Sequence, residues 1–251
     1  MLNYKCGNMK NSKKSSKKQL KPKMAVVLLG PPGAGKGTQA NLLADKLSFY
    51  YLETSKIIEN AFKEGGKDDF VKVGGKKYFL RDEKEKWEKG VLCSLPFFIG
   101  LMKKKIGKIY EIDESLILAG SPRTLDEARI VIPLLEKLYG KKNIKLVLIK
   151  LSAEMSIYRN SHRRICRLMR HPIIYNKETV HLTKCPLDGS KLMRRKGLDS
   201  PEIIKVRLKE YKERTYPLIK FFRGKGFKVK EISGAGSVSK VFREVLKAIG
   251  M

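Results

Sequence analysis

The stretch Gly30-Pro31-Pro32-Gly33-Ala34-Gly35-Lys36-Gly37-Thr38 decides the fold class of this chain. It follows an apolar run, residues 25–29, and opens residues 36–47, whose apolar side chains recur at helical spacing. A glycine loop between a strand and a helix is typical of a phosphate-binding loop, in which backbone N–H groups and the helix N-terminus surround phosphate and a lysine adds its charge. The sequence therefore predicts binding of a nucleoside triphosphate.

Short apolar strands alternate with helices along the rest of the chain. Further strands are expected at residues 49–52, 115–119, 144–151 and 227–232, and helices at 55–63, 125–138, 153–165 and 237–249. Continuous apolar strands separated by helices predict a parallel sheet covered on both faces. The expected fold class is therefore α/β, a phosphate-loop fold with a five-stranded parallel core.

Two stretches interrupt this alternation and are expected to form small inserted lobes. Residues 59–90 contain a predicted hairpin, 70–80, with Gly74-Gly75 at its turn, and a charged helical piece, 82–89. Residues 165–198 are rich in Arg, Lys and His and have no long periodic pattern. The expected organisation is a basic tail at 1–23, core at 24–58, the first lobe at 59–90, core at 91–164, the second lobe at 165–198 and core at 199–251.

The chain is strongly basic, with 55 Lys and Arg against 25 Asp and Glu and a formal charge of +30. This charge favours polyanionic ligands. Residues 1–23 carry eight lysines, no acid and almost no bulky apolar side chain, which predicts a disordered tail. The tail is interpreted as a solvated extension or a misassigned start, and a nucleic-acid tether is the alternative.

Apolar runs such as residues 144–151 fall well short of the ~20 residues that cross a bilayer, so no membrane span is expected. The four cysteines lie far apart, and no signal-peptide pattern precedes them. We therefore expect a monomer in the reducing cytoplasm.

Several motifs together resemble the adenylate kinase family of nucleoside monophosphate kinases. Gly35-Lys36-Gly37-Thr38 is one, and Gly120-Ser121-Pro122-Arg123-Thr124 looks like that family's Gly-Phe-Pro-Arg-Thr signature. Arg159 and Arg163, spaced i to i+4 on an expected helix, and Asp199-Ser200-Pro201-Glu202 with Arg207 beyond it are similar to the segments that border the family's lid. The resemblance runs from about residue 24 to the C-terminus. It implies transfer of the terminal phosphoryl group of ATP to a nucleoside monophosphate, with AMP as the expected acceptor.

Phosphoryl transfer depends on alignment and cations rather than on a proton relay. By resemblance, the catalytic cations are Lys36, Arg123, Arg163 and Arg207. The implied ATP site comprises Gly33, Ala34, Gly35, Lys36, Gly37, Thr38, Arg159, Arg163 and Gly236. The implied monophosphate site, in the first lobe and the adjoining core, comprises Thr54, Lys56, Glu59, Val91, Cys93, Gly120, Arg123, Glu127, Lys196 (or Arg195) and Arg207.

Three positions depart from the family pattern. Ala119 stands where the family has an Asp that holds water bound to Mg²⁺, so the Mg²⁺ expected with ATP would rest on Thr38, phosphates and water, or on an acid elsewhere. Glu59 replaces a phosphate-binding arginine, and Lys56 is a candidate for the missing charge. Glu127 replaces an adenine-reading glutamine and suits a base edge that offers donors, as guanine does. The alternative for Glu127 is an ordinary charged first turn of its helix.

The second lobe is similar to the lids of this family that bind zinc through Cys-x-x-Cys and a second Cys-x-x-Cys or Cys-x-x-Asp. Met169 occupies the second ligand position, and a thioether is a poor zinc ligand. His171 is the candidate substitute, which gives the set Cys166, His171, Cys185 and Asp188. The alternative is a metal-free lobe held by packing and hydrogen bonds.

Two other functions stay open at this point. One is a kinase of the same fold that acts on GMP, UMP, CMP or a small metabolite instead of AMP. A basic nucleic-acid-binding protein that has lost turnover would explain the charge and the residues at Ala119 and Glu59.

Overall fold

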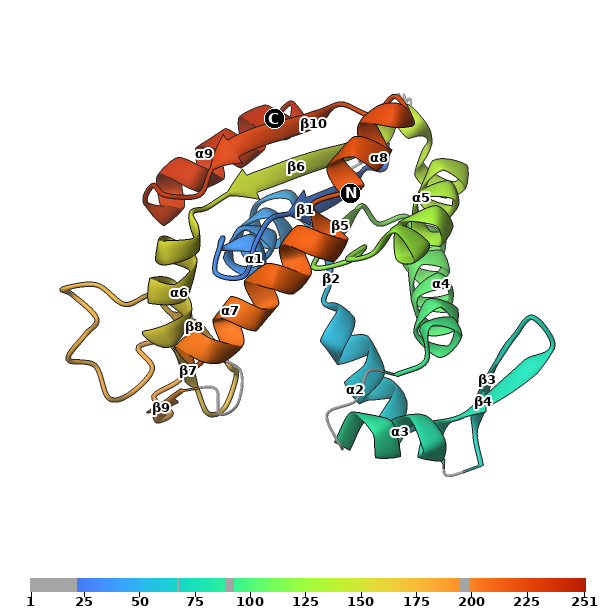
Figure 1. Ribbon diagram of the computed structural model, residues 1–251, viewed down its shortest axis with the longest axis horizontal. Helices are drawn as coiled ribbons and strands as arrows, with labels where there is room; N and C mark the ends of the chain where they lie inside the picture. The colour runs from blue at the N-terminus through green and yellow to red at the C-terminus, as the bar shows by residue number, and fades with distance from the viewer. Residues whose placement is uncertain (1–21, 67, 89–92, 195–198) are drawn as a thin grey trace, which may run out of the picture.

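The central sheet has five parallel strands in the order β10-β6-β1-β5-β2 (Figure 1). The computed structural model describes residues 22–66, 68–88, 93–194 and 199–251. The strands are β1 (Ala25–Leu29), β2 (Tyr50–Leu52), β5 (Leu116–Ala119), β6 (Ile144–Lys150) and β10 (Val229–Ser233). The expected α/β fold and parallel five-stranded core are confirmed. Strand β1 is the central strand, so the loop that follows it lies at the middle of the sheet's carboxyl edge.

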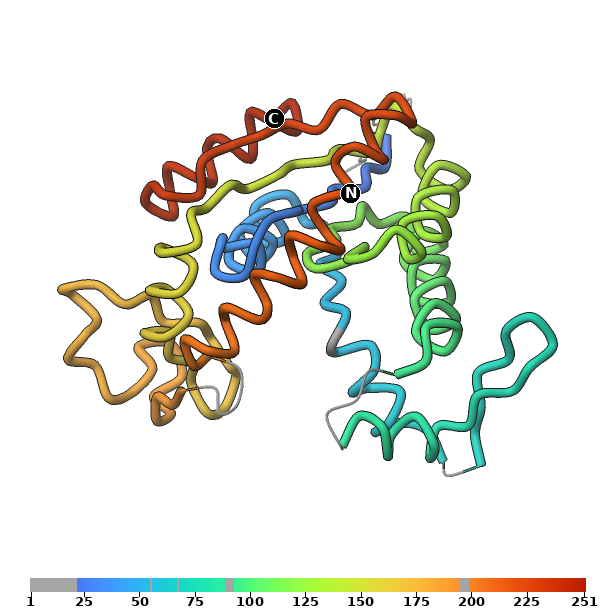
Figure 2. The backbone as a smooth tube through the Cα atoms, viewed as in Figure 1, coloured from blue at the N-terminus to red at the C-terminus, as the bar shows by residue number. Residues whose placement is uncertain are grey.

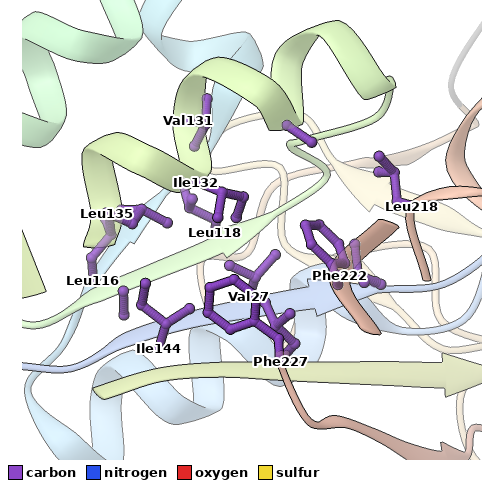
Figure 3. Packing of buried hydrophobic residues seen from close by; sticks show 14 of the residues in the cluster. Val27, Leu116, Leu118, Val131, Ile132, Leu135, Ile144, Leu218, Phe222 and Phe227 are labelled. Carbon is purple, nitrogen blue, oxygen red and sulfur yellow. The ribbon is translucent and has the colours of Figure 1, made fainter. Parts of the chain in front are cut away.

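Each face of the sheet is covered by its own set of helices. Side chains of α4 (Leu95–Glu111), α5 (Leu125–Tyr139) and α8 (Leu218–Gly224) pack with alternate residues of β1 in one cluster. Figure 3 shows Val27 of β1 with Ile132 of α5 and Phe222 of α8 in this cluster. Side chains of α1 (Lys36–Leu47) and α9 (Val238–Ile249) pack with Val26 and Leu28 on the other face. Burial on both faces explains why the strands read as continuous apolar runs.

Helix α4 was absent from the sequence expectations. It buries Phe97, Ile99, Met102, Ile106 and Ile109, an apolar stripe at helical spacing. Three lysines, of which Lys103 and Lys104 are exposed and Lys105 is half-buried, stand between Met102 and Ile106 in the sequence and conceal the pattern. The helices expected at 55–63, 125–138 and 237–249 are confirmed to within a residue at each end.

The first lobe contains α2 (Thr54–Glu64), the antiparallel pair β3 (Phe70–Val73) and β4 (Lys76–Phe79), and α3 (Leu80–Glu88). We call these described residues, 54–66 and 68–88, the hairpin lobe. The predicted hairpin is confirmed, with positive φ at both turn glycines, Gly74 (57°) and Gly75 (82°). The buried carboxylate of Glu83 accepts hydrogen bonds from the backbone N–H of Ser94 (2.7 Å) and from Lys86 (2.8 Å), and so joins the lobe to the start of α4.

The second lobe follows α6 (Ala153–Ser161) and contains a small sheet, β8-β7-β9. Its strands are β7 (Arg164–Cys166), β8 (Pro172–Ile173) and β9 (Leu192–Met193). We call residues 164–194 the cysteine lobe. Figure 2 shows it and the hairpin lobe projecting from the same side of the core, at opposite ends.

The expectation of a helix over 153–165 was wrong at its C-terminal end, because α6 stops at Ser161. The Ser161 hydroxyl donates to the Ile157 carbonyl (2.8 Å), and His162 Nδ1 bonds the Tyr158 carbonyl (2.8 Å), so side chains satisfy the last carbonyls. Arg164 then pairs with Ile173 in the small sheet. Arg159 and Arg163 are therefore not on one helical face.

The chain returns to the core through α7 (Pro201–Glu210) and a π-helical turn (Tyr211–Thr215), and a short 3₁₀ helix (Lys141–Asn143) links α5 to β6. Lys23, expected in the tail, is anchored instead: its ammonium pairs with Asp113 (2.8 Å) and lies 3.7 Å from the ring centroid of Tyr110. Residues 1–21 lie outside the described residues. Among the described helices, none has the length and apolar character needed to cross a membrane.

Candidate functional site

The glycine loop joins β1 to α1 in a conformation that needs its glycines. Gly30 and Gly33 have φ of 145° and 74°. A Cβ at Gly30 would lie 2.4 Å from the Ile149 carbonyl oxygen, and one at Gly33 would lie 2.5 Å from Asn160 Nδ2. Within this loop the Lys36 ammonium donates to the carbonyls of Gly30 (2.7 Å) and Pro31 (2.9 Å).

Helix α6 and the segment after β10 pack directly against this loop. The Ser156 hydroxyl donates to the Pro32 carbonyl (2.6 Å), and Arg159 Nη1 donates to the Gly33 carbonyl (3.5 Å). A Cβ at Gly234 would lie 3.4 Å from the Ala34 carbonyl oxygen, so the turn that continues to Gly236 adjoins the loop. The segments expected to flank ATP, which carry Arg159 and Gly236, are thus both beside it.

Four cations from distant parts of the sequence converge here. The pKa of Lys36 is lowered to about 7, first by burial and then by the positive charges of Arg123, Arg207 and Arg163. Burial disfavours the charged form of Lys36, and the nearby arginines disfavour it further because like charges repel. An electropositive pocket of this kind is complementary to several phosphate groups. The predicted catalytic cations are therefore brought together in space.

Asp199 holds two of these arginines from the start of α7. Its buried carboxylate receives Arg163 Nη2 at 2.6 Å and Nε at 3.3 Å, a two-point contact. Arg207 Nη1 lies 4.0 Å from the same carboxylate. Sequence reasoning placed Asp199 in a family-like segment but gave it no role, because its partners lie in other elements.

Arg123 follows β5 at the carboxyl edge of the sheet. Its Nε donates to the Gly120 carbonyl (2.5 Å), and Thr215 donates to the Arg123 carbonyl (2.9 Å). Glu127 Oε2 accepts from the Arg123 backbone N–H (2.8 Å) and from the Ser121 hydroxyl (3.1 Å). One oxygen of Glu127 thus stabilises the start of α5, and its role in reading a base stays a prediction.

The other residues expected to bind the acceptor lie mostly on α2. Thr54 is buried at the first position of that helix, Lys56 pairs with Glu53 (3.2 Å), and Glu59 is half-buried. Cys93 lies against α3, its Sγ 3.6 Å from the Glu83 carbonyl oxygen, and burial is the main reason that its pKa is raised to about 11. Val91, Arg195 and Lys196 lie outside the described residues.

The cysteine lobe assembles a compact set of metal-ligating atoms. One atom each from Cys166, His171, Cys185 and Asp188 lies within 4.8 Å of the others. His171 Nδ1 is 3.6 Å from each sulfur and 3.3 Å from Asp188 Oδ2. Ligands of tetrahedral zinc, at about 2.0–2.3 Å from the metal, are separated by about 3.3–3.8 Å. The three separations from His171 match this range, and Cys166 Sγ donates to Asp188 Oδ2 at 2.9 Å, so the set suits zinc once these two atoms move slightly apart. Met169 is 64% exposed and lies outside the set.

A glycine loop at the carboxyl end of a central parallel strand, faced by arginines from other segments, defines a phosphate-loop nucleotide-binding protein. A family model described as adenylate kinase matches residues 28–227. The chain belongs to the adenylate kinase family, as the sequence resemblance predicted. This membership supports a phosphotransferase that acts on nucleoside monophosphates.

Individual relatives align with nearly the whole chain. An adenylate kinase of Methanothrix thermoacetophila is 33% identical over 228 residues, which cover 90% of this chain and 98% of the relative. An adenylate kinase of Clostridium botulinum is 31% identical over 229 residues, with 90% and 99% covered. One of Desulforamulus reducens is 32% identical over 228 residues, with 90% and 100% covered.

Proposed function

We propose that this protein transfers the terminal phosphoryl group of ATP to AMP, forming two molecules of ADP. The convergence of Lys36, Arg123, Arg163 and Arg207 at the glycine loop carries the proposal. Phosphoryl transfer spreads negative charge over several oxygens, and preorganised cations stabilise that charge. The names of the relatives, all adenylate kinases, support AMP as the acceptor.

Each cation has a proposed task. Lys36 holds the β and γ phosphates, and Arg123 binds the acceptor phosphate through two parallel hydrogen bonds. Arg163 and Arg207, held by Asp199, bind the phosphoryl group in transit, while Arg159 and the turn at Gly236 border the ATP base. Mg²⁺ bound with ATP neutralises part of the phosphate charge, and the Thr38 hydroxyl, next to Lys36 in the loop, is a suitable oxygen ligand.

A panel of acceptors tests the proposal. The full chain is incubated with ATP, Mg²⁺ and AMP, GMP, UMP or CMP in turn, and formation of ADP is measured. AMP is expected to give the highest kcat/KM. A higher kcat/KM for another monophosphate would assign that monophosphate as the acceptor instead of AMP. No turnover with any of them, together with salt-sensitive binding to polynucleotide, would favour a nucleic-acid-binding protein.

Nucleotide binding is expected to take up protons near neutral pH. Lys36 has a pKa of about 7 in the free protein, and bound phosphates favour its charged form and raise that pKa. Between the two pKa values the complex holds more protons than the free protein, so ATP affinity should fall as the pH rises through about 7. Calorimetry in buffers of different ionisation enthalpy measures the uptake. Lys36→Met should abolish it, and an equal heat in all buffers for the parent would contradict the assignment.

Acceptor choice is expected to respond to Glu127. If its second carboxylate oxygen faces the acceptor base, Glu127→Gln replaces an acceptor by a donor and retains an oxygen for the Arg123 N–H. A mispaired buried polar group costs about 1–3 kcal/mol, so kcat/KM for AMP relative to GMP should rise by about one to two powers of ten. Steady-state kinetics with both acceptors measure the ratio. An unchanged ratio would assign Glu127 only to the start of its helix.

We further propose that the cysteine lobe binds zinc through Cys166, His171, Cys185 and Asp188. The separations among the four ligand atoms support this assignment. Structural zinc stabilises small domains directly because the ligands are brought together only in the folded state. The chemistry at the glycine loop does not require this metal.

Metal analysis of the purified chain is expected to find one zinc, and Cys185→Ser should lose it and lower the melting temperature. Cys93→Ser is the matched control, since Cys93 is free and lies outside the cluster. Removal of zinc with a chelator should lower the melting temperature of the parent but not of Cys185→Ser. Absence of metal from the purified parent would support a lobe held by packing alone. So would a melting temperature of the parent that does not change when the chelator is added.

Three further expectations stay predictions: the cytoplasmic location, the monomeric state and the role of the basic tail. The tail, apart from Lys23 and its neighbour Pro22, lies outside the described residues.

A further inference from the structure

One carboxylate lies among the residues that directly follow the five strands at the carboxyl edge of the central sheet. Ligands of open parallel sheets bind at this edge. The residues that directly follow the five strands are Gly30, Glu53, Gly120, Leu151 and Gly234. Carboxylate oxygens are suitable ligands for Mg²⁺ and for its bound water, so Glu53 is the acid at this edge that suits Mg²⁺ carried by ATP.

The sheet register places Glu53 beside Ala119. β2 and β5 are parallel, with Tyr51 opposite Ile117 and Leu52 opposite Leu118. One further step puts Glu53 next to Ala119, and Glu53 has the extended backbone of the strand (φ −88°, ψ 113°). Neighbouring strands lie about 4.8 Å apart, so the two positions are adjacent across the ladder.

The alternation of side chains places Glu53 on the face of the sheet that α1 covers. Tyr51 and Ala119 both pack against the cluster that includes α1, on the same face of the sheet. Because side chains of a strand alternate between faces, Glu53 leaves the sheet on the face of Tyr51 and therefore of α1. The loop's own helix thus lies on the side where this carboxylate emerges.

Tyr51 links Glu53 to the start of α1. Its hydroxyl would lie 3.5 Å from a Cβ at Gly37, the residue between Lys36 and Thr38. Burial raises the pKa of the Tyr51 phenol, and the negative charge of Glu53 raises it further. The Glu53–Lys56 pair (3.2 Å) has side chains 39% and 68% exposed, and exposed pairs contribute about 0–1 kcal/mol. The ion pair with Lys56 is therefore weak.

We propose that Glu53 is the positioning residue that holds the hydrated Mg²⁺ of Mg·ATP, a task for which Ala119 offers no ligand. The inference rests on the proposed function, since it concerns the metal that accompanies ATP. The carboxylate acts through water bound to the metal, with Thr38 and the phosphates as the nearer ligands. The carboxylate that Ala119 does not provide is supplied from the adjacent strand.

Binding of Mn²⁺ to the protein complexed with a non-hydrolysable ATP analogue tests this role, with free and bound Mn²⁺ distinguished by electron paramagnetic resonance. Glu53→Gln is expected to weaken Mn²⁺ binding about tenfold, as loss of an outer ligand commonly does. The double variant Glu53→Gln with Ala119→Asp moves the carboxylate to the adjacent strand and should restore Mn²⁺ binding. Glu88→Gln is the control, since it removes one acid of an exposed pair with Lys84 (3.9 Å) in the hairpin lobe.

The outcomes separate this inference from the proposed function. Mn²⁺ affinity that stays within twofold in Glu53→Gln, while the parent binds both the analogue and Mn²⁺, would overturn the role of Glu53 and leave the proposed function intact. Equal losses of Mn²⁺ affinity in Glu53→Gln and Glu88→Gln would show that the effect comes from net charge alone. That result would also overturn the role of Glu53. A parent that does not bind the analogue would contradict the proposed function itself.

Discussion

Lys36→Met is expected to lower kcat by at least about 10³-fold, or about 4 kcal/mol of transition-state stabilisation, without unfolding the protein. The ammonium is the mobile charge of the glycine loop and lies among three arginines. Its pKa of about 7 means that the charged form is disfavoured in the free protein by burial and by these neighbours. Methionine has a similar length and removes that repulsion, so the melting temperature should not fall.

The control for Lys36→Met is Lys46→Met, which removes a lysine from the last turn of the same helix, α1, on an exposed position. It should leave kcat, KM and the melting temperature unchanged. Steady-state kinetics and thermal melting of the three proteins measure the contrast. A kcat of Lys36→Met within tenfold of the parent would contradict the assignment of the glycine loop to the catalytic site.

Arg163→Ala is expected to lower kcat by about 10²–10³-fold while changing KM for either nucleotide much less. Asp199 fixes this guanidinium at 2.6 Å, so its charge is already positioned when charge develops on the phosphoryl group. Such preorganised stabilisation acts more strongly on the transition state than on the bound substrates. A loss confined to KM would assign Arg163 to substrate binding instead.

Arg167→Ala is the matched control for Arg163→Ala. Arg167 lies four residues further along, in the cysteine lobe, and its side chain is exposed. Both changes remove one positive charge from a basic chain, so a general effect of charge would appear in both. Only Arg163→Ala should lower kcat. Asp199→Asn should give a smaller loss of kcat, because it loosens Arg163 and Arg207 without removing them.

Local sequence patterns were sufficient for the central sheet. Strands buried on both faces leave continuous apolar runs, and the glycine loop with its lysine is a contiguous motif, so both are visible along the chain. Helix α4 was missed because lysines stand between its apolar residues in the sequence. The predicted end of α6 was too late because Ser161 and His162 cap the helix through their side chains, an effect that hydrophobic spacing does not report.

The candidate ligand set of the cysteine lobe was visible in part from the sequence. Cys166, Cys185 and Asp188 stand at motif spacing, and the poor ligand chemistry of Met169 pointed to His171 as the substitute. The turn between β7 and β8 then brings His171 Nδ1 to 3.6 Å from Cys166 Sγ and leaves Met169 exposed. Chemistry selected the candidates, and chain geometry brought their ligand atoms together.

By itself the sequence determined the α/β class and the glycine loop with its lysine, because each depends on neighbours within a few positions of the chain. The candidate arginines came from the resemblance to the family. Only the tertiary structure decided which distant residues meet: that Asp199 holds Arg163, and that Glu53 lies beside Ala119. The latter depends on the register between β2 and β5, strands separated by more than 60 residues, and register is fixed by packing on both faces of the sheet rather than by local preference.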